Sequence, residues 1–245
     1  MPVFMCPSDE LEIFFLPSTS KSPLSGPEGP RHGDRGSGSF PAICRNFGVV
    51  AVSREPGSRG GRLGHAMARK LGYTLFDREA LEFLAGQPDR MSQVVDCLPP
   101  AGQIWVEERL RLLAREIKHF DEVQSIARLV NALAAQGGVV IVGRGAGFLL
   151  PSECLLHLRV VGERGDRQRY LAQWLRLPAE QAEVALAEAD RRRQDFLHRH
   201  FGPAFASPIS YDAIVNTSRL GEEGALLVAQ QAMLARFPGQ TPVPA

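Results

Sequence analysis

A glycine-rich stretch, residues 53–64 (SREPGSRGGRLG), lies between an apolar run and a segment of helical periodicity. The run Val49–Val52 is typical of a buried strand, and apolar residues recur at helical spacing over Leu63–Leu71. Strand, glycine-rich turn and helix in this order direct backbone N–H groups and a helix N-terminus at one point, which suits a phosphate group. Three arginines lie in or beside the turn: Arg54, Arg59 and Arg62. The stretch predicts a phosphate-binding turn; a βα turn whose glycines only satisfy backbone geometry is the alternative.

Two glycine patterns can be placed on this stretch, and neither fits completely. Aligned on the helix start, the P-loop pattern G-x-x-x-x-G-K-[ST] places Arg54 and Arg59 at its glycines, Gly60 at its lysine and Gly61 at its hydroxyl residue. A second register uses four glycines of a dinucleotide-binding loop: Gly57, Gly60, Gly61 and Gly64. In that register Asp77, at the end of the next expected strand, would be the ribose-binding acid.

Composition excludes several classes of protein. A chain of 245 residues with 44% apolar and 22% charged residues suits one α/β domain with appendages. The net charge of +1 provides no global field toward nucleic acid or a membrane surface, and neither is expected as a partner. The four cysteines are scattered and form no C-x-x-C pair, and no apolar run approaches the ~18 residues of a membrane span, so we expect a cytoplasmic protein.

Three regions differ in character along the chain. Residues 1–46 include a Pro-, Ser- and Gly-rich part without periodicity and predict a disordered tail, residues 47–237 predict the folded domain, and residues 238–245 predict a flexible end. In the folded part, apolar strands at 49–53, 74–76, 139–142, 155–161 and 213–215 alternate with helical segments, while 87–102 is expected to be irregular. This alternation predicts a parallel sheet covered on both faces. Ligands of such sheets bind at the carboxyl ends of the strands, where Arg54, Asp77, Arg144 and Asn216 fall.

Taken together, the motifs resemble the cytidylate kinase-like family of P-loop nucleoside monophosphate kinases. The resemblance extends over residues 47–237 and is carried by Val52–Arg62, Leu75–Leu81, Val140–Ala146, Asp190 with Arg193, and Tyr211–Thr217. It implies an α/β fold of three layers, P-loop NTPase-like, with a helical insertion and an arginine-bearing LID. It also implies ATP with Mg²⁺ as donor and a nucleoside monophosphate, CMP or dCMP, as acceptor.

The resemblance also assigns roles to residues. The donor triphosphate would lie on Gly57, Ser58, Arg59, Gly60, Gly61 and Arg62. The acceptor side would hold Asp77, Arg78 and Arg144, and Asp190 would order Arg191–Arg193 on the LID, with Arg193, Asp190 and Arg144 as the catalytic group. No magnesium ligand stands out in the sequence, although Asp77 is a candidate.

Several alternatives stay open at this point. Asp77 can instead cap the helix that follows it, and the run Arg191–Arg193 can be a solvated helix face. Cytidylate kinases carry Gly-Arg-Asp where this chain has Gly143–Gly145, and a Tyr-Arg pair where it has Glu82-Phe83, so the acceptor base is open. Three functions therefore compete: a nucleoside monophosphate kinase, a nucleotide-binding regulator without turnover, and a dinucleotide-dependent oxidoreductase. The sequence leaves the oligomeric state open as well.

Overall fold

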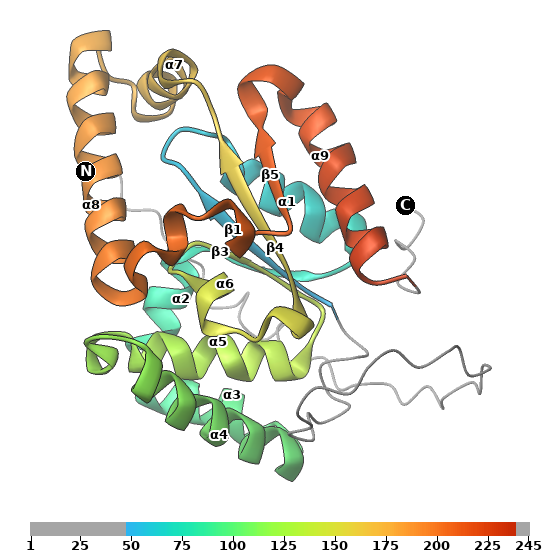
Figure 1. Cartoon of the computed structure of the whole chain (residues 1–245). Helices are drawn as coiled ribbons and strands as arrows, with labels where there is room; N and C mark the ends of the chain where they lie inside the picture. Colours follow the sequence, from blue (N-terminus) through green and yellow to red (C-terminus); the bar gives the residue numbers. More distant parts are fainter. Residues whose placement is uncertain (1–47, 239–245) are drawn as a thin grey trace. The chain divides into compact units, whose positions relative to one another are not determined.

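Five parallel strands form the sheet of this computed structural model, which describes residues 48–238 (Figure 1). The strands are β1 (Val49–Arg54), β2 (Thr74–Phe76), β3 (Val139–Val142), β4 (Leu155–Val161) and β5 (Ala213–Asn216). Their order is β2-β3-β1-β4-β5, with Val52 of β1 opposite Val142 of β3 and Leu158 of β4. The expected parallel α/β fold is confirmed, and all strands end at one edge of the sheet. The expected tails, apart from Pro238, lie outside the described residues.

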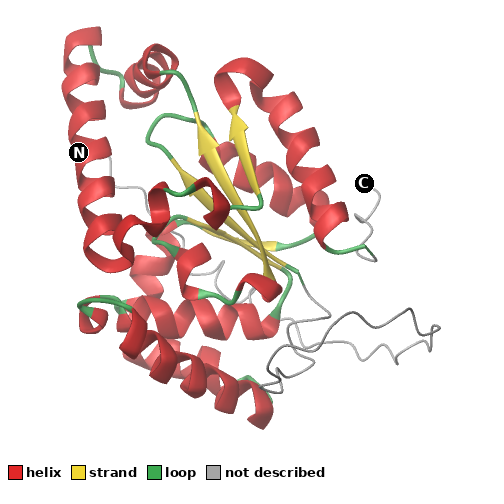
Figure 2. Ribbon diagram, in the orientation of Figure 1, coloured by secondary structure: helices red, strands yellow, loops and turns green. Residues whose placement is uncertain are grey.

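Helices cover both faces of the sheet and produce the three expected layers (Figure 2). One face is covered by α1 (Gly60–Leu71) and α9 (Thr217–Arg236). The other is covered by the inserted helices α2 (Arg78–Ala85) and α5 (Gln124–Gln136) and by the short α6 (Ala146–Leu149), while α3 (Pro88–Asp96) and α4 (Pro100–Glu116) pack on α5. Two further helices, α7 (Arg164–Leu175) and α8 (Ala179–Phe201), pack on each other beside the carboxyl edge of the sheet. None of the helices between residues 48 and 238 combines the length and apolar character that a membrane crossing requires.

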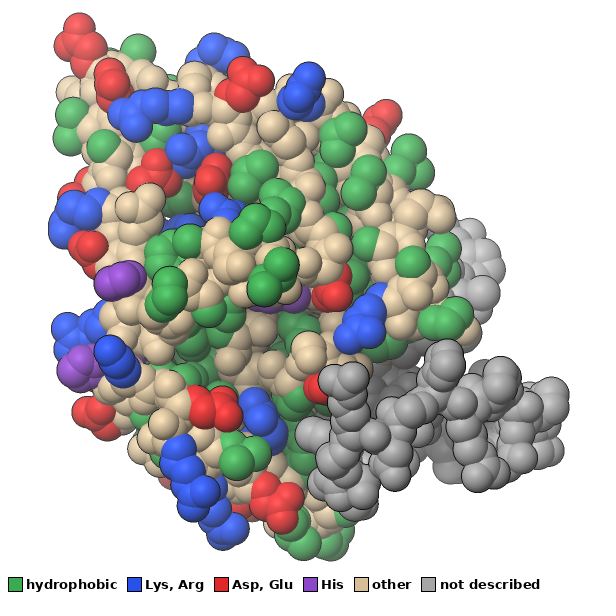
Figure 3. Space-filling view, viewed as in Figure 1, with side chains coloured by type: hydrophobic (Ala, Val, Ile, Leu, Met, Phe, Trp, Pro, Cys, Tyr) green, Lys and Arg blue, Asp and Glu red, His purple; other side chains and the backbone are tan. Residues whose placement is uncertain are grey.

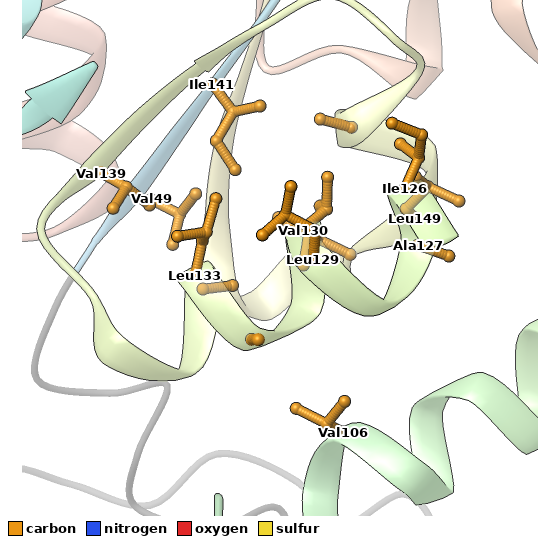
Figure 4. Close-up of a cluster of buried hydrophobic side chains, with 14 of the residues drawn as sticks. Val49, Val106, Ile126, Ala127, Leu129, Val130, Leu133, Val139, Ile141 and Leu149 are labelled. Carbon is orange, nitrogen blue, oxygen red and sulfur yellow. The ribbon is translucent and has the colours of Figure 1, made fainter. Parts of the chain in front are cut away.

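Alternation along the central strand builds the two cores. Val49 and Ala51 of β1 belong to the cluster under α5, whereas Val50 and Val52 belong to the cluster under α1 and α9. All four are at most 1% exposed, which explains why the run is apolar at every position. Figure 4 shows part of the first cluster, where Leu133 and Val130 of α5 face Val49, Val139 and Ile141 of the sheet. Loss of such fully buried side chains costs about 2–5 kcal/mol each, so these two layers fix the carboxyl edge in place.

Two boundaries differ from the sequence expectation. The stretch 87–102, expected to be irregular, contains all of α3 and the first turn of α4, so that prediction was wrong. Pro88 and Pro100 are the first residues of these helices, a position where proline loses no hydrogen bond, rather than breakers of regular structure. Helix α9 begins four residues earlier than expected, at Thr217, with a kink at Gly221 (φ 67°).

Candidate functional site

The glycine-rich loop, residues 55–59, is a tight turn held by its own hydrogen bonds. The carbonyl oxygen of Glu55 accepts a bond from the Ser58 amide at 3.2 Å and one from Ser58 Oγ at 2.7 Å. Thr217 Oγ1 at the start of α9 donates to the carbonyl of Ser58 at 2.8 Å. Ser58 is 1% exposed, so its hydroxyl builds the loop and is turned away from solvent. The loop is thereby fixed to both β1 and α9.

Glycines let the loop approach its neighbours closely. Gly57 has φ +75°, and a Cβ atom there would lie 2.5 Å from the backbone oxygen of Arg167 on α7. A Cβ atom on Gly60 would lie 2.6 Å from Cβ of Arg54, whereas Gly61 faces open space with nothing within 4 Å. Gly57 and Gly60 therefore serve close packing, and Gly61 leaves room beside the N-terminus of α1. The open backbone N–H groups of this helix start suit an anion.

Arg59 and Arg62 lie on the α9 side of the loop. Arg59 Nε is 3.6 Å and Arg62 Nη1 is 2.9 Å from Oε1 of Glu222. The Arg59 guanidinium also lies over the ring of Tyr170 on α7, 5.0 Å from its centre. Arg59 adopts a left-handed conformation (φ 59°), which fits its alignment with a glycine of the P-loop pattern. These two arginines line a cavity of about 30 Å³ with Thr217 and Glu222.

A group of three arginines, here called the arginine cluster, lies on the other side of the loop: Arg159 of β4, Arg167 of α7 and Arg193 of α8. Arg167, only 8% exposed, donates to both carboxylate oxygens of Asp190 at 2.8–3.1 Å and to the carbonyl of Pro56 at 3.1 Å. Arg159 lies over the ring of Tyr211, 5.5 Å from its centre, and donates to the Phe205 carbonyl at 3.3 Å. The cluster thus joins the loop, the sheet edge and the α7–α8 pair.

The contacts of Asp190 extend the expectation from the sequence. Asp190 is predicted to order Arg191–Arg193; its hydrogen bonds in the described part of the chain go to Arg167, and its charge raises the pKa of Arg193. Arg191 and Arg192 lie on the exposed face and pair with Glu188 and Asp195, where Figure 3 shows charges of both signs mixed along α8. Arg193 is the one of the three that is half-buried, and the charges of Glu55, Asp190, Arg159 and Tyr211 shift its pKa. Arg159 and Arg167 carry no motif signal, and sequence reasoning missed both.

Burial makes this edge of the sheet favourable for an anion. Burial lowers the pKa of Arg193, and Arg159 lowers that pKa further, against the raising effect of Tyr211, Glu55 and Asp190. Burial also lowers the pKa of Arg54, whose guanidinium lies against Gly143 at the end of β3. The Nε groups of Arg144, Arg159 and Arg167 are buried without a hydrogen-bond partner. Cations that have lost water and retain unpaired donors gain free energy from a bound anion.

On the β2–β3 side, Arg144 is held by two neighbours. Its Nη2 is 3.1 Å from Oε1 of Glu82 on α2, and its guanidinium lies over Phe196 of α8, 4.7 Å from the ring centre. A Cβ atom on the next residue, Gly145 (φ +70°), would lie 2.3 Å from the Phe201 ring, so an aspartate there would require that ring to move. Glu82 therefore supplies the carboxylate beside Arg144 from a different element.

Asp77 and Arg78 begin α2. The Asp77 carboxylate accepts the Ala80 amide at 2.9 Å, so it caps the helix. Arg78 is about half exposed and pairs with Glu79 and Glu82. Strand β3 separates Asp77 from the glycine-rich loop, whereas a dinucleotide fold places the ribose-binding acid on the strand next to β1. The dinucleotide register and the oxidoreductase alternative are therefore wrong.

Carboxylates near the loop are already engaged. Between residues 48 and 238 no group of three or more His, Cys, Asp or Glu side chains could hold a metal ion. Asp190 binds Arg167, Asp77 caps α2, and Glu55 faces arginines. Among residues 48–238, a cage of three or more protein ligands is therefore not what would hold Mg²⁺, which commonly takes one or two carboxylates together with phosphate oxygens and water.

The chain thus combines a parallel α/β sheet covered on both faces, a glycine-rich β1–α1 loop and arginines gathered at the carboxyl edge of the sheet. The chain belongs to the cytidylate kinase-like family, whose sequence profile matches residues 49–219. The predicted family is thus confirmed.

One solved structure agrees with the fold. An uncharacterized protein from Eubacterium ventriosum ATCC 27560 superposes with a TM-score of 0.60 at 17% identity, covering 78% of this chain and 99% of that chain. Shikimate kinases from Bacteroides thetaiotaomicron and Acinetobacter baumannii are more distant. Their TM-scores are 0.41 and 0.42, their identities 15% and 13%, and they cover 76% and 78% of this chain and 98% and 93% of their own. No curated protein matches the chain.

Proposed function

We propose that the chain is a phosphotransferase of the nucleoside monophosphate kinase type, which moves the γ-phosphoryl group of ATP to a nucleoside monophosphate, CMP or dCMP. The observation that carries the proposal is the arginine cluster beside a glycine-rich loop that lacks a lysine. Phosphoryl transfer needs alignment of the reactants and neutralisation of charge, and little covalent help from the protein. Planar guanidinium groups from three elements supply that charge.

In this proposal the donor and acceptor occupy opposite sides of the cluster. The triphosphate lies on residues 57–62, where Gly61 leaves open space, and the acceptor phosphate lies near Arg144, with Asp77 and Arg78 at the start of α2. Arg193 stabilises the transferring phosphoryl group, and Asp190 acts through Arg167. Because the nearby carboxylates already have partners, the triphosphate would supply most of the ligands of Mg²⁺, which would neutralise phosphate charge when bound.

One observation favours a second candidate, a nucleotide-binding regulator without turnover. Gly60 and Gly61 stand where the P-loop pattern has its lysine and hydroxyl residue, and Arg59 and Arg62 are paired with Glu222. Such a protein would bind ATP through the loop and leave it intact.

The test is incubation of the purified chain with γ-labelled ATP, Mg²⁺ and each nucleoside monophosphate in turn. We expect label to appear in CDP or dCDP. A thermal-shift series with ATP and CMP runs beside it, because ligands that bind the folded state raise the melting temperature. Stabilisation by ATP without transfer to any monophosphate would favour the regulator, and neither binding nor transfer would contradict both candidates.

A further inference from the structure

Glu55, the first residue of the glycine-rich loop, has a backbone and a side chain with separate tasks. Its amide donates to the Val160 carbonyl at 3.0 Å and its carbonyl closes the turn with Ser58. The carboxylate points away from the Ser58 turn and is largely buried, with 23% of the side chain exposed. Its Oε2 accepts the amide of Gly162, just after β4, at 3.3 Å. A side chain from the loop thus reaches the segment that leads into α7.

Two members of the arginine cluster lie against this carboxylate. Arg167 Nε is 3.6 Å from Oε2, and Arg159 Nη2 is 3.9 Å from Oε1. The third member, Arg193, is close enough for the charge of Glu55 to raise its pKa. Arg167 lies between two carboxylates, Glu55 from the loop and Asp190 from α8. Three cations therefore share two anions in a half-buried space.

We infer that Glu55 is a positioning residue, which holds Arg159 and Arg167 beside the loop so that the cationic site is assembled before a phosphate binds. The inference rests on the proposed function in taking the bound anion to be a polyphosphate. Without Glu55, three guanidinium groups would repel one another across a site of low dielectric, and Arg167 would lose one of its two polar contacts with the loop and keep the one to the Pro56 carbonyl. Assembly in advance spares the bound state the cost of ordering these side chains.

Electrostatics makes the inference testable, because a carboxylate beside an anion site has two opposite possible effects. If Glu55 only competes with the phosphate, Glu55→Gln removes a repulsive charge and raises the affinity for anions. If Glu55 positions the arginines, the same change lowers the affinity by about tenfold, which corresponds to one charge-assisted hydrogen bond. The sign of the change therefore separates the two roles.

The experiment compares the full chain with Glu55→Gln and with a matched control, Glu183→Gln. Glu183 of α8 pairs with Arg164 of α7 at 3.4 Å, and both side chains are more than half exposed, so the control removes an α7–α8 ion pair away from the loop. Calorimetry measures binding of inorganic tripolyphosphate and of ATP. Hydrogen exchange of the ligand-free proteins measures opening at Gly162 and the first turn of α7. Steady-state kinetics gives kcat and the KM for CMP.

We expect Glu55→Gln to weaken tripolyphosphate binding about tenfold, to exchange faster at Gly162 and α7, and to lower kcat with the KM for CMP unchanged. The control is expected to match the parent. Stronger or equal anion binding, or unchanged exchange, would overturn the inference. If the parent itself binds neither tripolyphosphate nor ATP, the proposed function fails and the exchange data alone decide the role of Glu55. Should Glu55→Gln not fold, Glu55→Asp, which withdraws the charge by one methylene, is measured with the same expectation.

Discussion

The three consecutive arginines on α8, Arg191–Arg193, differ in exposure and in their partners. Arg191 and Arg192 make exposed ion pairs with Glu188 and Asp195, which contribute little to stability. Arg193 is half-buried, burial lowers its pKa, and the charge of Glu55 in the loop acts on it. Because side chains on adjacent helical positions point about 100° apart, only one of the three can face the site. The proposed catalytic role therefore falls on Arg193 alone.

Arg193→Ala should lose most phosphotransfer, on the order of a thousandfold in kcat, while ATP affinity falls only modestly. The reason is that charge on the moving phosphoryl group is greatest in the transition state. Arg193→Lys should not restore the rate, because lysine lacks the planar fork. Arg192→Ala is the matched control and should keep the parent rate. Full activity in Arg193→Ala would contradict the assignment.

At the residue scale, the sequence placed only part of the site. Arg54 and Arg144 could be predicted at the carboxyl edge because Arg54 ends the buried strand β1 and Arg144 lies two residues after the end of β3. Arg167 and Arg159 could not, because one lies within a helix and the other within a strand, with no local pattern to mark them. Their meeting at Glu55 depends on how α7 and α8 pack beside the sheet. The partner of Asp190 was missed for the same reason: Arg167 is 23 residues away in sequence.

At the scale of helices and strands, most elements could be predicted from the sequence, but the close contact between the glycine-rich loop and α7 could not. Strands and most helices followed from periodicity, since fully buried strands are apolar throughout and α1 and α5 carry clear apolar stripes. Helix α3 was missed because the prolines and polar residues of 87–102 are typical of a loop. The sequence does not reveal that Pro88 stands at the first position of a helix, where proline is tolerated. Only tertiary structure reveals that Gly57 touches the backbone of Arg167.

Gly57→Ala should lower the free energy of unfolding by about 1–3 kcal/mol, because it combines a positive φ with a clash against backbone that cannot turn away. Gly61→Ala is the control, since nothing lies within 4 Å of its Cβ position, and its stability should stay within about 0.5 kcal/mol of the parent. Urea denaturation followed by circular dichroism measures both. Equal stability of the two variants would contradict the close packing of Gly57 against the backbone of α7.

For the molecule as a whole, a buried histidine makes stability depend on pH. His157 of β4 is 4% exposed, with Nε2 3.0 Å from Ser53 Oγ and its ring against Phe148 and Tyr211. Burial lowers its pKa from 6.5 to about 4, against the raising effects of a backbone hydrogen bond to Ser210 and the charge of Asp212. The unfolded chain therefore binds a proton that the folded chain does not.

Stability should be highest above pH 6.5 and should fall by roughly 3 kcal/mol as the pH drops from 6.5 to 4, because the unfolded state takes up the proton first. Denaturation curves at a series of pH values measure this slope. In His157→Gln the decrease over this range should be much smaller, whereas His198→Gln, at an exposed position, should leave it unchanged. A parent protein with equal stability at pH 6.5 and 4 would contradict the assignment.

The excess of buried arginine donors at the sheet edge has a practical consequence for anyone who handles the protein. Sulfate or phosphate from a buffer or a crystallisation medium would compete with nucleotides for the same guanidinium groups and would raise the melting temperature by itself. A thermal-shift series in phosphate buffer would then make a true substrate look inert. Comparisons among nucleotides are therefore best made in chloride salts of constant ionic strength, with an inorganic phosphate series as the reference.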